Sequence, residues 1–373
     1  MVQLVRISLR EIHLPLKEPF RISSGVCLNR RIMLLELEDA DGAIAWSECV
    51  AGEAPNYSSE TIDTAWIVMV EYIAERILGV PFSTPDDVHP ALELNFRDHH
   101  MAKAAVEMGM WALFAEKEQL SLAQRLGGTR AEIATGISLG IQDSPAALVD
   151  RVGKALAQGY RKVKLKIEPG CDIEYVRAVR EAFPDAPLMA DANNAYTLSD
   201  TPRLAQLDSF GLMMIEQPLA HDDLVRHAEL QRALRTSICL DESITSVERA
   251  EDMLTLGSGR IINIKPGRVG GFQQSRAIHD LCVRNDIPVW CGGMLESGIG
   301  RAYNVALASL AGFTKPGDVS PSARYWEQDI VTPEWTMSAT GMVRVPTDRP
   351  GIGVTVDVDR IDDLTVRAEV CVA

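Results

Sequence analysis

The feature that most constrains this chain is a repeated spacing between ionisable side chains that end short apolar runs. Asp191, Glu216 and Asp241 lie 25 positions apart. Lys166 comes 25 positions before the first of them, and Lys265 comes 24 positions after the last. Each residue closes or follows an apolar run, in the segments KVKLKI, APLMAD, LMMIEQP, SICLDES and RIINIKP. One strand, one helix and two turns take about 25 residues, so successive strand ends in a ring would point these groups at one place.

The same spacing predicts the fold class. From about Ile133, strand-like runs alternate with amphipathic segments such as SPAALVDRVGKALAQGY and CDIEYVRAVREAFP. Seven or eight such units favour an α/β fold, a (β/α)7β TIM-type barrel, over an open doubly wound sheet. Because barrel active sites gather at the C-terminal ends of the strands, the spaced side chains mark the expected site. The candidate strands are IATGISLG, RKVKLKI, APLMAD, FGLMMIEQP, TSICLD, GRIINIK and IPVWCGG, followed by a short one near Asp318.

The segments outside this alternating region predict a second domain. The first 60 residues alternate like strands, and the chain then has helical periodicity to about Leu120. The final stretch is strand-like again and is punctuated by Gly and Pro. We therefore expect an α+β capping domain formed by the N-terminal segment and the C-terminal tail. The expected boundaries are 1–125 for the N-terminal part of the cap, 126–325 for the catalytic barrel and 326–373 for the tail that returns to the cap.

Two stretches rich in Gly, Ser and Pro interrupt the predicted strands of the cap. They are KEPFRISSG, near 17–25, and ECVAGEAPNYSSET, near 48–61. Such segments form surface loops, and binding residues are often carried on loops of this kind. We predict that both are mobile covers over the site.

Composition excludes several classes of function. The 373 residues suffice for a barrel of about 250 residues and a second domain. A net charge of −15 argues against nucleic acid as a partner. No apolar stretch approaches the length of about 18 residues that spans a bilayer, so no membrane association is expected. The seven cysteines are scattered without a CxxC pair, and the N-terminus lacks a signal-peptide pattern, so we expect reduced thiols and a cytoplasmic location.

The three spaced carboxylates predict a divalent-cation site. Oxygen ligands with no nearby Cys or His favour Mg²⁺, with Mn²⁺ as a possible substitute. The alternative is that Asp191 and Asp241 cap the helices that follow them, since Asp is a common N-cap residue. Equal spacing after apolar strands favours the metal. Glu216 supports it, because a carboxylate that closes the apolar run LMMI needs a counter-charge.

The lysines predict proton-transfer chemistry. Lys164 and Lys166 are two residues apart, so their side chains leave a strand on the same face, and Lys265 arrives from four strands away. The alternative is a solvated basic edge that includes Lys162. Repulsion between amines and a nearby cation would lower a lysine pKa towards the range in which it acts as a base. Two such bases suit removal of a proton alpha to a carboxylate, with a Mg²⁺-stabilised enediolate.

These residues resemble the pattern of the enolase superfamily, in its muconate-lactonizing-enzyme subgroup. That subgroup has K-x-K on the second barrel strand, Asp, Glu and Asp on the next three, and a lysine on the sixth. The resemblance extends over essentially the whole chain. It implies Lys166 and Lys265 as the acid/base pair, Lys164 as an electrostatic aid, and Asp191, Glu216 and Asp241 as the ligands of Mg²⁺.

Longer stretches resemble the o-succinylbenzoate synthase / N-succinylamino acid racemase family. They are DANNAYTL, IKPGRVGGF and WCGGMLESGIGRAYNVALASLAGFTKPGDVSPSARYW. This resemblance implies dehydration of 2-succinyl-6-hydroxy-2,4-cyclohexadiene-1-carboxylate in menaquinone biosynthesis and racemisation of N-succinylamino and other N-acylamino acids. It also implies a small carboxylate substrate and a homo-oligomer. The candidate substrate-binding residues are Ser138, Asn193, Arg268, Gly293, Met294 and Glu296.

Three other functions stay open. A dipeptide epimerase and a muconate cycloisomerase use the same scaffold, although GGMLESGIGR fits the cycloisomerase less well. A barrel of this fold could also be a non-enzymatic scaffold or binding protein. The complete set of six ionisable groups argues against that reading.

Overall fold

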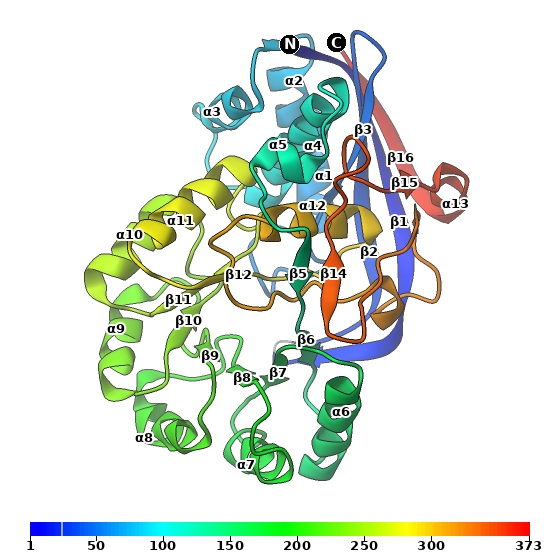
Figure 1. Ribbon diagram of the computed structural model, residues 1–373. Coiled ribbons are helices and arrows are strands. Elements are labelled where there is room, and N and C mark those ends of the chain that lie inside the picture. Colours follow the sequence, from blue (N-terminus) through cyan, green and yellow to red (C-terminus); the bar gives the residue numbers. More distant parts are fainter. Residues whose placement is uncertain (24) are drawn as a thin grey trace.

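A closed parallel barrel forms the larger part of the computed structural model, which describes residues 1–23 and 25–373 (Figure 1). Seven parallel strands are hydrogen-bonded in the order β12-β11-β10-β9-β8-β7-β6. The strands are β6 (Ile137–Leu139), β7 (Val163–Lys166), β8 (Leu188–Asp191), β9 (Ile215–Glu216), β10 (Ile238–Leu240), β11 (Ile261–Ile264) and β12 (Val289–Cys291).

Residues 313–318 take the eighth position in the ring. The Asp318 amide donates to Cys291 O of β12 at 2.9 Å, and the Gly136 amide donates to Gly317 O at 2.7 Å. The segment therefore joins β12 to the chain just before β6. The predicted (β/α)7β barrel, including its short last strand near Asp318, is confirmed.

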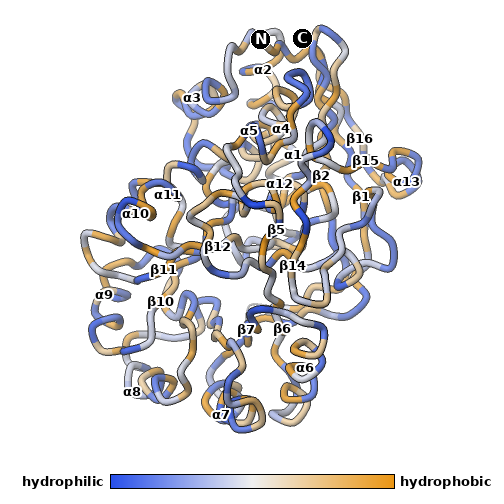
Figure 2. The backbone as a smooth tube through the Cα atoms, in the orientation of Figure 1, coloured by the Kyte–Doolittle hydropathy of each residue, from blue (hydrophilic) through white to orange (hydrophobic). Residues whose placement is uncertain are grey.

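The helices of the barrel form its outer layer. Their inward faces carry apolar residues at helical spacing, such as Leu148, Val152 and Ala155 of α6, which are all buried. In Figure 2 these helices alternate between hydrophilic and hydrophobic colours along their turns. They are α6 (Pro145–Ala157), α7 (Ile173–Ala182), α8 (Thr201–Leu204), α9 (Leu224–Ala233), α10 (Val247–Leu256), α11 (Phe272–Arg284) and α12 (Gly298–Ala308), with the short turns η3 (Leu198–Asp200), η4 (Ala205–Phe210) and η5 (Ser322–Arg324).

The cap is an antiparallel sheet covered by helices. Its strands run in the order β16-β1-β2-β3, and β4 also pairs with β1. The strands are β1 (Val2–Ile22), β2 (Gly25–Asp39), β3 (Ile44–Cys49), β4 (Pro81–Phe82) and β16 (Thr365–Val372). The helices are α1 (Ile62–Val68), η1 (Met69–Ile73), α2 (Ala74–Ile77), η2 (Pro85–Asp87), α3 (Val88–Glu93), α4 (His100–Lys117) and α5 (Leu122–Leu126).

The C-terminal tail contacts both modules. Strand β14 (Met342–Arg344) pairs with β5 (Glu132–Ala134) beside the barrel, and β13 (Val331–Thr332) pairs with β15 (Thr355–Val356). After α13 (Val358–Leu364), β16 pairs with β1, so both chain ends lie in the cap (Figure 1). The predicted return of the tail to the cap is confirmed. The domain boundaries at 125/126 and 325/326 stay predictions.

The predicted strand IATGISLG is wrong as a single element, because it forms β5 and β6 with a break at Gly136. A Cβ atom at Gly136 would lie 2.7 Å from Lys162 Cε and 2.9 Å from its carbonyl oxygen. The chain therefore changes partner at a position that only glycine can occupy without displacing the buried lysine.

The stretch 17–25 is also not the loop that its composition predicts. It is the end of a long β1–β2 hairpin, in which Phe20 pairs with Cys27 and Ile22 pairs with Gly25. Ser24 lies outside the described residues. Residues 50–61 do form an irregular connection from β3 to α1. In the part of the chain that the structure describes, no helix is long and apolar enough to cross a membrane.

A buried carboxylate joins the cap to the barrel. Glu107 of α4 accepts hydrogen bonds from the amides of Phe272, at 2.7 Å, and Gln273, at 3.0 Å, at the start of α11. It also accepts one from Trp111 Nε1 at 2.9 Å. Burial raises the pKa of Glu107 to about 7, against the effect of these donors. The carboxylate thus supplies acceptors for amides that have no partner within their own helix.

We expect Glu107→Ala to destabilise the protein by about 3 kcal/mol, since it leaves three buried donors without an acceptor. The midpoint of urea unfolding, followed by circular dichroism, measures this change. Glu118→Ala, at the exposed end of the same helix, is the control and should change stability by less than about 0.5 kcal/mol. Equal stability of the two variants would contradict the joining role of Glu107.

Candidate active site

The barrel brings the spaced side chains together at the C-terminal ends of adjacent strands. Lys166 pairs in register with Asp191, and Asp191 pairs with Glu216. Cys239 of β10 pairs with Glu216, so Asp241, two residues later and directly after the strand, points to the same face. All these ionisable residues are buried, with Lys166 the most exposed at 9%. Lys265 follows β11 directly and is also buried.

The lysines and carboxylates form a network of ion pairs. Lys166 Nζ lies 2.7 Å from Asp191 Oδ2, and Lys265 Nζ lies 2.8 Å from Asp241 Oδ2. Lys164 Nζ lies between Asp191 Oδ2, at 3.2 Å, and Glu216 Oε2, at 3.1 Å. The carboxylates therefore face ammonium groups in the barrel interior.

This arrangement excludes the two structural alternatives. Lys162, Lys164 and Lys166 are all buried, so they do not form a solvated basic edge. Asp191 and Asp241 do not cap the helices that follow, because the N-cap residues there are Thr197 and Ser246.

Charge and burial set the pKa values of the site. Burial lowers the pKa of Lys164 and Lys265, but their carboxylate neighbours outweigh it and raise both well above the ordinary value. The predicted lowering rests on neighbouring amines and a cation, whereas these carboxylates act in the opposite direction, so the lowering stays a prediction for the cation-bound site. Burial and the charge of Asp191 raise the pKa of Glu216 to about 8. The nearby lysines keep the pKa of Asp191 and Asp241 below the ordinary value, although burial opposes this.

Three supporting residues were not found from the sequence. Asp318 Oδ2 lies 2.6 Å from Lys164 Nζ, and Asn263 Nδ2 donates to Glu216 Oε1 at 2.7 Å. Tyr57 donates its hydroxyl proton to Asp241 Oδ1 at 2.8 Å. Asn263 stands two residues before Lys265 on the same strand face, which could have identified it. Tyr57 comes from the cap and has no signal in the barrel pattern.

The side chains present fit a hard divalent cation by their chemistry. In residues 1–23 and 25–373, no three acidic, histidine or cysteine side chains already converge as a ligand cluster. However, three adjacent strands present buried carboxylates, and Asn263 Oδ1 is buried without a hydrogen-bond partner. Such oxygen donors are those that Mg²⁺ prefers.

A cavity of about 280 Å³ lies over the lysines, between the barrel and the cap. From the barrel it is lined by Lys166, Asn193, Lys265, Gly293, Met294 and Leu295. From the cap it is lined by Phe20, Ile22, Gly25, Val26, Cys27, Asn29, Arg30, Gly52, Glu53, Ala54, Asn56 and Tyr57. Both predicted covering stretches therefore contribute to its wall.

The candidate substrate-binding residues divide into two groups. Asn193, Gly293 and Met294 line the cavity, and Asn193 Oδ1 accepts a hydrogen bond from Lys166 at 2.5 Å. The other three lie outside its wall. Arg268 is buried against Asp241, Glu296 accepts from the Met294 amide at 2.6 Å, and Ser138 lies on β6 opposite Lys164.

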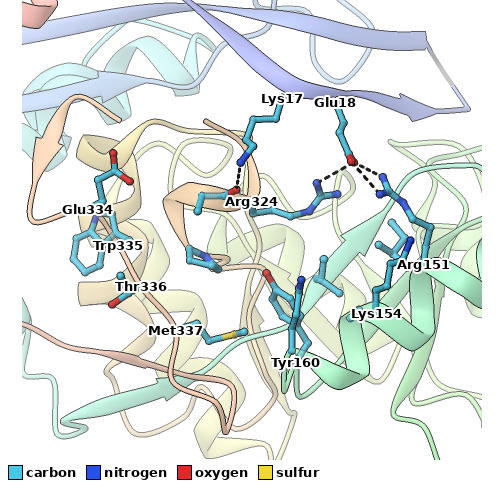
Figure 3. A pocket seen from close by; sticks show the side chains of 16 residues that line it. Lys17, Glu18, Arg151, Lys154, Tyr160, Arg324, Glu334, Trp335, Thr336 and Met337 are labelled. Carbon is cyan, nitrogen blue, oxygen red and sulfur yellow. Dashed lines mark hydrogen bonds and ion pairs between the residues drawn. The ribbon is translucent and has the colours of Figure 1, made fainter. Parts of the chain in front are cut away.

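A larger pocket, of about 590 Å³, lies outside the barrel beside α6 (Figure 3). Its guanidinium groups point at one carboxylate. Arg151 Nη1 lies 3.1 Å from Glu18 Oε1, and Arg324 Nη1 lies 3.8 Å from Glu18 Oε2. None of the residues that line it belongs to the spaced set, so the smaller cavity is the candidate active site.

Comparison with known proteins places the chain in a family. Residues 5–127 match the mandelate racemase / muconate lactonizing enzyme N-terminal domain, and residues 147–360 match the enolase C-terminal domain-like family. The chain is 49% identical to an o-succinylbenzoate synthase of Geobacillus kaustophilus, over 96% of this chain and 95% of the relative. It is 47% identical to an N-succinylamino acid racemase of Amycolatopsis sp., over 98% of each.

A crystal structure of an enolase superfamily member from Listeria innocua superposes with a TM-score of 0.96 at 40% identity, covering 100% of both chains. The matched domains span the cap and the barrel in this order, and the superposition includes both. The chain therefore belongs to the enolase superfamily, with the N- and C-terminal domains of the mandelate racemase / muconate lactonizing enzyme family.

Proposed function

We propose that the protein is a Mg²⁺-dependent enzyme that removes the proton alpha to a substrate carboxylate. Its reactions are the dehydration that forms o-succinylbenzoate and the racemisation of N-succinylamino acids. The observation that carries this proposal is the placement of two amines, Lys166 on β7 and Lys265 after β11, in the wall of one cavity. The proposal includes the small carboxylate substrate, the cytoplasmic location and the homo-oligomer expected from the sequence.

In each direction of the reaction the two lysines have different tasks, and in one direction Lys166 removes the proton. Lys166, as the free amine, takes the alpha proton as the C–H bond breaks, and the ammonium that it becomes pairs with Asp191. Lys265 remains an ammonium beside Asp241 and stabilises the negative charge that develops on the substrate. When bound, Mg²⁺ would neutralise charge on the substrate carboxylate. Asp191, Glu216 and Asp241 are the residues that would hold it.

The two reactions differ in what happens to the electron pair that the broken C–H bond leaves on the alpha carbon. In the dehydration, the pair left by the C–H bond forms a C=C bond as hydroxide leaves from the neighbouring carbon, and the product ring becomes aromatic. In the racemisation, Lys265 returns a proton to the opposite face of the same carbon, and the reverse direction exchanges the roles of the lysines. One pair of side chains therefore serves both reactions.

Deuterium exchange tests the shared step. In D₂O, both enantiomers of N-succinylphenylalanine should exchange their alpha proton, because either lysine can act on its own face. Proton NMR measures the loss of the alpha signal, and polarimetry measures racemisation of the same samples. The matched control is the alpha-methyl ester of N-succinylphenylalanine, which differs only in lacking the reacting carboxylate and should be exchanged far more slowly by the enzyme.

Three results would redirect the proposal. If neither enantiomer exchanges, the racemase activity is absent. Faster epimerisation of a dipeptide than of any N-succinyl substrate would favour the dipeptide epimerase alternative. Absence of both exchange and dehydration would support the scaffold alternative.

A further inference from the structure

Arg30 is a buried cation in the wall of the active-site cavity. It lies on β2, opposite Leu14 of β1, and only 6% of its surface is exposed. Within residues 1–23 and 25–373, no carboxylate forms an ion pair with its guanidinium group. The other two cations of the wall, Lys166 and Lys265, are each paired with an aspartate. Arg30 is therefore the cation of this wall that lacks an anion.

The hydrogen bonds of Arg30 leave its donors incompletely used. Nη2 donates to the carbonyl oxygens of Val50 and Ala51, each at a long distance of 3.4 Å. Nε is buried and has no hydrogen-bond partner. An arginine carries five N–H donors in a planar fork that matches a carboxylate. Leaving such a charge buried and unpaired is costly, so the site favours an added anion.

Two other arginines, by contrast, each have a carboxylate partner. Arg31, the next residue of β2, lies 2.7 Å from Glu11 and 2.8 Å from Asp63. In the outer pocket, Arg151 pairs with Glu18 (Figure 3). Each of these guanidinium groups has a protein carboxylate, whereas Arg30 has only carbonyl oxygens.

The acidic residues near Arg30 are already used or exposed. The oxygens of Glu48 accept from the Ser297 hydroxyl at 2.6 Å and from the Gly300 amide at 3.1 Å, at the start of α12. Glu53 lines the cavity but is exposed to solvent. A ligand carboxylate is therefore the remaining candidate for the counter-charge.

We propose that Arg30 binds the second carboxylate of a dicarboxylate substrate and so selects N-succinyl over uncharged N-acyl groups. This inference rests on the proposed function and adds the residue that recognises the distal end of the substrate. The reacting carboxylate lies at the lysine end of the cavity, and the distal carboxylate lies against the β2 wall. Arg30 thus sets specificity without taking part in proton transfer.

A pair of matched substrates tests this inference. N-succinylphenylalanine and its terminal amide have nearly the same size and shape, but only the first carries the distal charge. We expect the wild-type enzyme to prefer the acid in kcat/KM by about 10- to 100-fold, the usual effect of a hydrogen bond to a charged group. In Arg30→Met the ratio should fall to about one, and Arg30→Lys should keep part of it.

Arg31→Met is the matched control, because it removes the neighbouring guanidinium of the same strand and should leave the ratio unchanged. Thermal unfolding of each variant shows whether it is folded, and the wild-type ratio needs no variant. Two outcomes would overturn the inference: equal use of acid and amide by the wild type, or an unchanged ratio in Arg30→Met. If the wild type exchanges neither substrate, the proposed function fails instead, and calorimetric binding of the same two ligands still decides the role of Arg30.

Discussion

Lys166→Ala is expected to lose alpha-proton exchange by about 10³-fold, within the usual range for removal of a general base. The physical reason is that the cavity wall offers one amine on the β7 side, and alanine leaves no group there that can accept the proton. Exchange in D₂O, followed by proton NMR for each enantiomer, measures the effect. The exposed Lys154, which pairs with Asp150 on α6, provides the control variant Lys154→Ala.

The pair of lysines makes this prediction more specific. If the two amines act on opposite faces, Lys166→Ala and Lys265→Ala should each retain slow exchange with opposite enantiomers. Full activity of Lys166→Ala would remove Lys166 from the role of base. Equal losses for both enantiomers in both variants would argue against one face for each lysine.

Glu216→Gln is expected to weaken binding of a divalent cation by at least about 100-fold. The substitution removes the negative charge of one cation ligand and changes the orientation of its oxygen donors. Glu216 is fully buried between strands that carry Asp191 and Asp241, so no other carboxylate can replace it by a small movement. Mn²⁺ binding, measured by electron paramagnetic resonance, tests this without reference to turnover. Turnover should fall in parallel and should be lost from the wild type when a chelator is added and restored by Mg²⁺.

The control for this change is Glu251→Gln, an exposed residue of α10, which should bind Mn²⁺ as the wild type does. Unchanged Mn²⁺ affinity in Glu216→Gln would show that Glu216 is not a ligand. The role of Glu216 would then be to form the ion pair with Lys164 and to accept the hydrogen bond of Asn263.

The barrel could be predicted because its signal is local and repeated. Most strands are short apolar runs, as in Ile261–Ile264, and several helices begin at a capping residue such as Ser144 or Ser246. The spaced acids and lysines follow these runs directly. Their positions around the ring therefore depend only on the order of the strands, which the period already implies.

The cap side of the site could not be predicted in the same way, because distant contacts decide it. KEPFRISSG has the composition of a loop, but Arg21 O accepts from the Ile141 amide at 3.0 Å, and a Cβ atom at Gly140 would lie 2.7 Å from Arg21 O. This contact holds the end of β1 against the barrel. Arg30 and Tyr57 reach the cavity through the same long-range packing, which no local pattern reports.

The carboxylate neighbours of the lysines could not be predicted for a related reason. Repulsion among Lys162, Lys164 and Lys166 can be read from adjacent positions in one strand. Asp318, the partner of Lys162 and Lys164, arrives more than 150 residues later, and its Oδ2 lies 2.6 Å from Lys164 Nζ. A carboxylate at that distance outweighs neighbouring amines in determining the pKa of Lys164.

Closure of the ring by residues 313–318 has a consequence for synthesis on the ribosome. Lys162 is fully buried, with Nζ 3.4 Å from the centroid of the Trp290 ring, and its only ion pair in the described chain is with Asp318. A buried ammonium without its partner is strongly unfavourable. Burial of Lys162 as a cation is therefore favourable only after residue 318 has left the exit tunnel, so we expect the barrel interior to stay hydrated until that point of synthesis.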